Sequence, residues 1–254
     1  MNTESTLAIE TAALSRAFGD FDAVRDLDLR VESGTMYGFL GRNGAGKSTT
    51  IKMLTGILKP TAGNIRLLGT NVANDESAIG VRRRIGVVPE DLALFDTLTG
   101  SEYLTFVARM YRLNDATLAD RINEVLDVLE VGADHKQLVL EYSHGMRKKL
   151  ALAAALLPDP DLLFLDEPFE GVDAVGSRIM RDILDRFVNR GSTVFLTSHV
   201  LDIVEGICSH VGIIDSGKLV FQDRMDSLSE RRLEDVFLEL VGSTEEMRSE
   251  LSWL

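Results

Sequence analysis

A glycine-rich segment, GRNGAGKST at residues 41–49, holds the residue types that most clearly suggest chemistry. Gly41 and Gly46 follow the spacing G-x-x-x-x-G-K-[ST], which Lys47 and Ser48 complete. In this pattern the glycines let backbone N–H groups approach phosphate oxygens, the lysine supplies positive charge, and the hydroxyl supplies a ligand for Mg²⁺. The segment therefore predicts a site for a nucleoside triphosphate. The residues expected to contact it are Gly41, Asn43, Gly44, Ala45, Gly46, Lys47, Ser48 and Thr49.

Two adjacent acidic residues offer the second part of such a site. Asp166 and Glu167 follow the apolar run at residues 162–165 in the segment LLFLDEP. We expect Asp166 to hold Mg²⁺ through water and Glu167 to orient or deprotonate the water that attacks the γ-phosphate, with Lys47 supplying positive charge. Adjacent acidic residues alone are common in turns, so their combination with the glycine-rich segment is what favours this chemistry.

Apolar runs of strand length recur along the chain and must position these residues. They are continuous and do not alternate with polar residues, which indicates strands covered on both faces, as in a parallel sheet flanked by helices. The glycine-rich segment follows one run and the acidic pair follows another. We therefore predict an α/β fold. The expected strands are residues 36–40, 85–88, 162–165, 194–196 and 211–214.

Two segments show the apolar spacing of amphipathic helices. Residues 117–130 carry apolar side chains at intervals of three and four, and Gly132 follows as a plausible stop. Residues 175–189 place their apolar side chains on one face, and Gly191 follows as a plausible C-terminal cap. Both segments are predicted to be helices that cover the sheet or each other.

Between residues 91 and 157 strand signals are weak and helix signals prevail. Thr99 and Glu102 have the spacing of a capping box, and Ser143 can cap a helix that continues through LALAAALL, residues 150–157. That apolar run is far below the ~20 residues that a helix needs to cross a bilayer. The simplest account is a helical subdomain inserted into an α/β core.

Composition narrows the class of protein. The 254 residues carry 27 Lys+Arg against 40 Asp+Glu, a formal net charge of −13, and 45% of them are hydrophobic. A chain of this length can bury a full core. The excess of acid argues against a protein that mainly grips nucleic acid, because neutralising phosphates takes a basic face. Its single cysteine, Cys208, cannot form an intrachain disulfide and is expected to pack in the interior.

Three short segments give the chain a family resemblance. YSHGM at residues 142–146 resembles the signature LSGGQ, FEGVD at residues 169–173 resembles a segment called the D-loop, and TSH at residues 197–199 ends in a histidine after a predicted strand. Together with the glycine-rich and acidic segments, in the same order, they make nearly the whole chain resemble the ATP-binding subunits of ABC transporters.

The resemblance implies roles for these segments. The Ser143 hydroxyl and the Gly145 backbone would bind the γ-phosphate of an ATP held by a partner subunit. Asp173 would help to couple two such sites across a dimer, and His199 would hydrogen-bond the γ-phosphate and the attacking water. His144 stands where the signature has a glycine, and we do not expect it to act as a base.

Two further positions are interpreted through the same resemblance. An aromatic residue ahead of the phosphate segment would stack on adenine, and Phe18 holds that place, with Phe21 as the second choice and a core phenylalanine as the plain alternative. Glu90 stands where the family usually has glutamine. Its oxygen can still ligate Mg²⁺ or water, but it adds a negative charge near the triphosphate.

The resemblance also implies the architecture. It predicts an α/β P-loop NTPase core with a flanking antiparallel β region and an inserted α-helical subdomain. The ATP-binding core would comprise residues 1–90 and 158–220, the helical subdomain with the signature residues 91–157, and a C-terminal helical extension residues 221–254.

The expected function is an ATPase with ATP and Mg²⁺ as its cofactors. It would form a homodimer, or a heterodimer with a second ATP-binding subunit, drive separate transmembrane permease subunits, bind no nucleic acid, and lie in the cytoplasm on the inner face of the cell membrane. A non-transport member of the superfamily, acting on DNA or in translation, is the alternative, although such proteins typically carry two motors, coiled-coil insertions or zinc modules. A small-molecule kinase would leave YSHGM and FEGVD unexplained.

The C-terminal extension bears on the direction of transport. From Ser227 onward it resembles the tails of bacterial subunits that serve exporters with separately encoded membrane proteins, which favours export. The other interpretation is an amphipathic helix that packs on the core or on a second copy. Its apolar stripe would be Leu233, Val236, Phe237 and Leu240.

Overall fold

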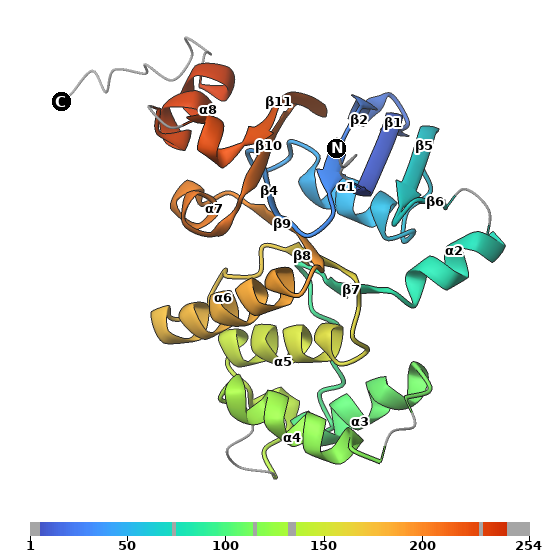
Figure 1. Ribbon diagram of the computed structural model, residues 1–254, viewed down its shortest axis with the longest axis vertical. Coiled ribbons are helices and arrows are strands. Elements are labelled where there is room, and N and C mark those ends of the chain that lie inside the picture. The colour runs from blue at the N-terminus through green and yellow to red at the C-terminus, as the bar shows by residue number, and fades with distance from the viewer. Residues whose placement is uncertain (1–5, 73–74, 114–115, 132–135, 229–230, 243–254) are drawn as a thin grey trace, which may run out of the picture.

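Two β-sheets form the upper part of the molecule in Figure 1. The structure is a computed structural model, and it describes residues 6–72, 75–113, 116–131, 136–228 and 231–242. The larger sheet has six strands, and the smaller has five. The order in the larger sheet is β11 (Lys218–Arg224), β10 (His210–Asp215), β4 (Met36–Leu40), β9 (Thr193–Ser198), β8 (Leu162–Asp166) and β7 (Ile85–Val88).

Neighbouring strands from β10 to β7 are parallel, and only β11 at the edge is antiparallel. Every residue of β4, β8 and β9 is buried, so the predicted strands with both faces covered are confirmed. In the register of the sheet, Asp166 lies opposite Thr197 and Leu40 opposite Ser198. The carboxyl ends of β4, β8 and β9 therefore lie side by side. The glycine-rich segment, the acidic pair and His199 are all found at this end of the strands.

The smaller sheet confirms the predicted antiparallel β region. Its strands pair in the order β2-β1-β5-β6, and β3 pairs with β1. Together with helix α1 (Lys47–Leu54), it shares a hydrophobic core with one face of the larger sheet. Its strands are β1 (Leu7–Phe18), β2 (Phe21–Leu27), β3 (Arg30–Glu32), β5 (Ala62–Leu67) and β6 (Thr70–Asn71).

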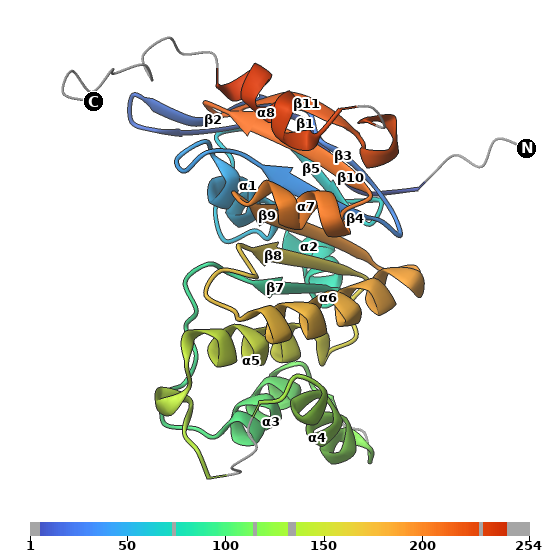
Figure 2. The same cartoon turned by 90° about the vertical axis from the view of Figure 1, so that its left-hand side faces the viewer.

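Helices cover the other face of the larger sheet and continue below it (Figure 2). A second core joins this face to α5 (His144–Leu156), α6 (Ala174–Asn189) and α7 (Leu201–Ile207). Helices α3 (Gly100–Met110) and α4 (Leu118–Val128) pack on α5, farther from the sheet. Helix α2 (Asp75–Arg82) lies beside β7.

The helix signals in the sequence correspond to real caps. Thr99 Oγ1 accepts a hydrogen bond from the Glu102 N–H at 3.3 Å, and the Glu102 carboxylate accepts one from the Thr99 N–H at 2.9 Å. Ser143 Oγ accepts from the Met146 N–H at 3.2 Å at the start of α5. Helices α4 and α6 confirm the two predicted amphipathic helices, while Gly132 lies outside the described residues.

The C-terminal part begins as a strand. Strand β11 runs to Arg224, past the predicted start of the extension at residue 221, and is followed by the short helix η2 (Met225–Leu228) and by α8 (Leu233–Val241). In the predicted stripe of α8, Leu233 and Val236 are buried, whereas Leu240 is exposed. Residues 243–254 of the predicted extension lie outside the description. No helix among the described residues has the length and apolar character needed to span a membrane.

Candidate nucleotide site

The loop between β4 and α1 is built so that its backbone can reach a ligand. A Cβ on Gly41 would lie 2.5 Å from the Ile214 carbonyl oxygen, and one on Gly46 2.6 Å from that of Ala23. Gly46 also has φ of 111°, a conformation that glycine adopts most easily. No side chain among the described residues caps α1, so its first N–H groups remain donors for an anion.

A pocket of about 340 Å³ opens over this loop and collects most of the predicted nucleotide-binding residues. The helix start, the lysine and the hydroxyls give it the donors that a phosphate chain requires. Gly41 and Ala45 belong to the same loop, but they are buried and do not line the pocket. The pocket is lined by Phe18, Phe21, Ala23, Arg42, Asn43, Gly44, Gly46, Lys47, Ser48, Thr49, Glu90 and Glu167.

Two aromatic rings border the pocket on the side of the smaller sheet. Phe18 and Phe21 pair across the turn between β1 and β2 and are 47% and 62% exposed. The Arg16 guanidinium lies 4.5 Å from the centre of the Phe18 ring. Phe18 is therefore not a core residue, and its ring is available for stacking.

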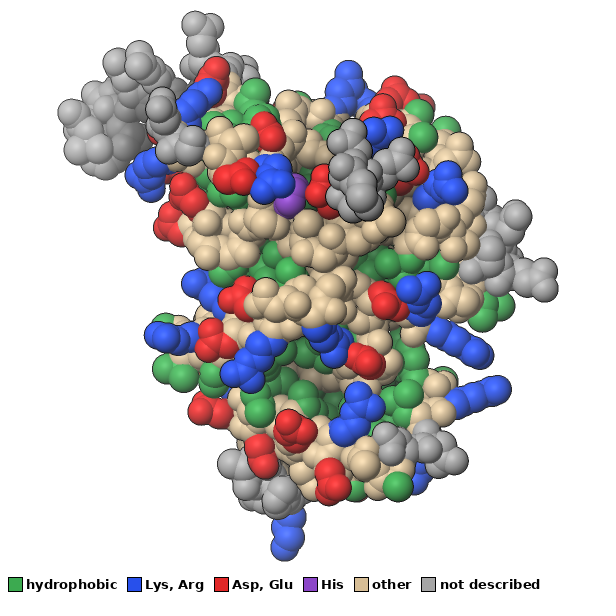
Figure 3. Space-filling model, in the orientation of Figure 1, with side chains coloured by type: hydrophobic (Ala, Val, Ile, Leu, Met, Phe, Trp, Pro, Cys, Tyr) green, Lys and Arg blue, Asp and Glu red, His purple; other side chains and the backbone are tan. Residues whose placement is uncertain are grey.

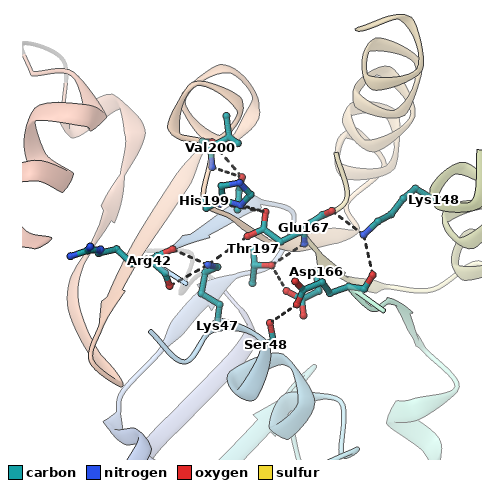
Figure 4. Close-up of polar contacts among 12 residues, drawn as sticks. Arg42, Lys47, Ser48, Lys148, Asp166, Glu167, Thr197, His199 and Val200 are labelled. Carbon is teal, nitrogen blue, oxygen red and sulfur yellow. Dashed lines mark hydrogen bonds and ion pairs between the residues drawn. The ribbon is translucent and has the colours of Figure 1, made fainter. Parts of the chain in front are cut away.

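Glu167 connects the loop to the histidine after β9. One carboxylate oxygen lies 3.5 Å from Lys47 Nζ, and the other lies 3.0 Å from His199 Nδ1 (Figure 4). The Glu167 side chain is 8% exposed and that of His199 45%. A carboxylate in this position can accept a proton from a water molecule held between the loop and His199.

Lys47 and Ser48 lie at the start of α1 and face the acidic residues. Lys47 Nζ donates to the Gly41 carbonyl at 2.8 Å, so the ammonium is held over its own loop. Ser48 Oγ donates to Glu90 Oε2 at 3.3 Å. A hydroxyl beside a carboxylate is a suitable pair of oxygen ligands for Mg²⁺, which usually takes only one or two carboxylates together with substrate phosphates and water. The described residues include no cluster of three or more His, Cys, Asp or Glu residues that could hold a metal ion.

Thr197 is a site residue that the sequence alone did not indicate. Its hydroxyl donates to Asp166 Oδ1 at 2.5 Å and accepts from the Glu167 N–H at 3.1 Å. It therefore fixes both members of the acidic pair. The signal in the sequence was the hydroxyl two residues before His199, on the strand next to β8.

Lys148 is a second site residue that the sequence alone did not indicate. Its side chain is completely buried, and Nζ donates to the backbone carbonyls of Glu167 at 3.1 Å and Glu90 at 3.3 Å. Burial lowers the pKa of Lys148, while nearby carboxylates, that of Glu170 foremost, act to raise it. A lysine in a predominantly apolar helix was the available signal.

The signature and D-loop residues do not line this pocket. Ser143 is exposed at the start of α5, and the Asp173 carboxylate caps α6 by accepting from the Gly176 N–H at 2.8 Å. A Cβ on Gly145 would lie 3.1 Å from the Gly171 carbonyl oxygen. The YSHGM and FEGVD segments therefore pack against each other, apart from the pocket of their own chain.

Comparison with known proteins identifies the family. A model of the ABC transporter family matches residues 24–170. The daunorubicin/doxorubicin resistance ATP-binding protein DrrA of Streptomyces peucetius is 40% identical over 220 residues, which are 87% of this chain and 66% of DrrA. The bacitracin transport ATP-binding protein BcrA of Bacillus licheniformis is 39% identical over 224 residues, which are 88% of this chain and 72% of BcrA.

Solved structures agree with this result. An ATP-binding subunit of an ABC transporter superposes with a TM-score of 0.84 at 27% identity, covering 92% of this chain and 99% of that one. The fold and the phosphate loop thus define a P-loop ATPase. The chain belongs to the ABC transporter family, as an ATP-binding subunit.

Proposed function

We propose that the chain hydrolyses ATP with Mg²⁺ and thereby energises export through separate transmembrane permease subunits. The observation that carries this proposal is the Glu167 carboxylate between Lys47 and His199, beside the phosphate loop. Export is supported by relatives whose names refer to drug resistance and bacitracin transport. The subunit would lie in the cytoplasm, against the inner face of the cell membrane.

In the proposed reaction each side chain has a defined task. The start of α1 and Lys47 stabilise negative charge on the phosphates, and Phe18 stacks on the adenine. Glu167 accepts the proton of the attacking water, which His199 helps to hold. Mg²⁺, when bound, would neutralise charge shared by the β- and γ-phosphates; Ser48, Glu90 and, through water, Asp166 would hold it.

The second half of each site would come from another subunit. Ser143 is exposed at the start of α5, where a helix N-terminus favours an anion, yet it lies outside its own chain's pocket. We propose that Ser143 and Gly145 bind the γ-phosphate of ATP on a second copy or on a related subunit. Asp173 would lie at the same interface.

An exposed apolar surface supports a protein partner for the helical region. Phe95, Phe106, Met110 and Tyr111 on and around α3 are each at least 40% exposed. Phe95 also stacks edge-on against Phe106, with ring centres 5.0 Å apart. Figure 3 shows further hydrophobic side chains exposed among the lower helices. Exposed apolar patches commonly mark interaction sites, and we propose that this one contacts a permease subunit.

The non-transport alternative is not favoured. The net charge of −13 provides no general attraction for nucleic acid, and the relatives named above are transport or resistance ATP-binding proteins.

Replacing Glu167 by glutamine tests the hydrolytic role. We expect Glu167→Gln to bind ATP with near wild-type affinity and to lose turnover, because the amide cannot accept the proton. ATP affinity is measured by calorimetry and turnover by phosphate release. Glu124→Gln, which removes an exposed carboxylate on α4, is the control and should hydrolyse ATP normally. Wild-type turnover by Glu167→Gln would contradict the assignment.

The same variant tests the shared site. If Ser143 and Gly145 bind the ATP of a second copy, Glu167→Gln should become a dimer when ATP is added, because the bound nucleotide is not consumed. Light scattering with and without ATP measures the mass directly. A monomer that ATP leaves unchanged would count against a homodimer, and a related subunit would then be required.

A further inference from the structure

Lys148 is buried deep in the molecule, and its hydrogen bonds to the site go to backbone carbonyls. It lies on α5, and its ammonium donates to the carbonyl of Glu167, which follows β8 (Figure 4). It also donates to the carbonyl of Glu90, which follows β7. A fully buried ammonium is costly unless its hydrogen bonds are satisfied. These two contacts therefore bind α5 firmly to the ends of both strands.

Glu167 has a backbone conformation that needs such support. Its φ is 47°, in the left-handed region that residues with a Cβ adopt at a cost in energy. The N–H of Glu167 donates to Thr197 Oγ1 at 3.1 Å, and its carbonyl accepts from Lys148 Nζ at 3.1 Å. The peptide groups on both sides of its Cα are thus held by side chains from two different elements.

This conformation also decides where the carboxylate lies. With the peptide groups held, the Glu167 side chain reaches Lys47 and His199. We propose that Lys148 is a positioning residue for ATP hydrolysis, which holds Glu167 in its left-handed conformation so that the carboxylate stays between the phosphate loop and His199. The inference rests on the proposed ATPase function and adds a residue to its machinery.

The neighbouring residue provides a matched control. Lys149 is also buried on α5, and its Nζ donates to the Glu130 carbonyl at 3.4 Å. Glu130 likewise has a positive φ, 53°, but it follows α4 and lies outside the pocket. Lys149→Met thus removes the same kind of contact from the same helix without touching Glu167.

Steady-state kinetics of the two methionine variants test the proposal. We expect Lys148→Met to lower kcat about 10- to 100-fold, the loss typical of a misplaced catalytic group, with little change in KM for ATP. Lys149→Met should keep kcat near the wild-type value. Lys148→Arg, which retains N–H donors, should recover part of the loss. Equal kcat values for Lys148→Met and Lys149→Met would overturn the proposal.

A second readout does not depend on turnover. The imidazole proton signals of His199, assigned with His199→Asn, should shift in nucleotide-free Lys148→Met and stay in place in Lys149→Met, because only the first moves Glu167. An unmoved signal would overturn the positioning role even if the wild-type chain hydrolysed no ATP, so the two proposals fail separately. Should Lys148→Met not fold, Lys148→Leu, which also lacks a donor, replaces it with the same expectations.

Discussion

Lys47 and Glu167 meet where water has little access, since each residue is less than a tenth exposed. Opposite charges that are shielded from solvent depend on each other, because removing one leaves the other uncompensated. Lys47 of the phosphate loop and Glu167, the proposed base, therefore form an ion pair in which each charge stabilises the other. Glutamine also removes the charge of Glu167, but it keeps the shape of the side chain and an oxygen that can accept from Lys47, so it disturbs this pair less than alanine would.

Measurements of ATP binding can distinguish the roles of the two phenylalanines that line the pocket. Because Arg16 covers one face of Phe18 and orders its ring, we expect Phe18→Ala to weaken ATP binding about tenfold, at the lower end of the 1–3 kcal/mol typical of one stacked base. Phe21→Ala, at the more exposed ring, should weaken it less. Calorimetry in the Glu167→Gln background measures both. A larger loss from Phe21→Ala would reverse the assignment.

At the scale of single residues, the sequence predicted the site residues that belong to a recognisable local motif. The loop glycines, Lys47 and Ser48 form one local pattern, so their meeting in a pocket could be anticipated. Lys148 and Thr197 act on Glu167 from 19 and 30 residues away. Their roles arise from how α5 and β9 pack beside β8, which no local spacing encodes.

Among the elements, helix α6 depends on an acidic cap that should respond to pH. The hydrogen bond from the Gly176 N–H lowers the pKa of Asp173 below its ordinary value of 3.8. A carboxylate whose pKa is lower in the folded state contributes stability above its unfolded pKa and loses it as pH falls through the folded pKa. This contribution is therefore present at neutral pH and disappears below about pH 4.

The variant Asp173→Asn tests this cap, because asparagine also caps helices but does not titrate. We expect the difference in Tm between wild type and variant to be constant from about pH 5 to 7 and to move in favour of the variant below about pH 4. Thermal unfolding followed by circular dichroism across this range gives the difference. A difference that does not change with pH would show that the ionised form of Asp173 has no special role.

The sequence predicted the buried elements better than the edges. Strands β4, β8 and β9 are wholly buried, and continuous apolar runs mark them. Strand β11 alternates half-buried with exposed residues up to Phe221 and ends in exposed polar ones, so its continuation to Arg224 was not apparent. The division into core, helical subdomain and extension stays a prediction.

For the molecule as a whole, the reactivity of the buried Cys208 thiol can be used to measure unfolding or local opening of the core. Cys208 is 7% exposed at the end of α7, packed against β4 so closely that a Cβ on Gly38 would lie 3.1 Å from its Sγ. Burial also raises the pKa of its thiol, which suppresses the reactive thiolate. We expect a thiol reagent to modify native Cys208 only through unfolding or local opening, at a rate that rises with urea.

A matched variant gives the reference rate. Gly206 is exposed, and no heavy atom lies within 4 Å of the position of its Cβ, so Cys208→Ala with Gly206→Cys moves the single thiol to the surface. This double variant should react rapidly without denaturant. If native Cys208 reacted as fast, the core around α7 and β4 would be far less stable than its packing indicates.

The contact between His144 and Gly171 limits how this protein can be recombined with its relatives. A Cβ on Gly171, whose φ is 70°, would lie 2.5 Å from the His144 ring. The bulky residue in the signature is thus accommodated by the bare backbone of the FEGVD segment. Chimeras that exchange one of these segments without the other would disturb this contact. The two segments should therefore be exchanged together when the protein is recombined with a relative.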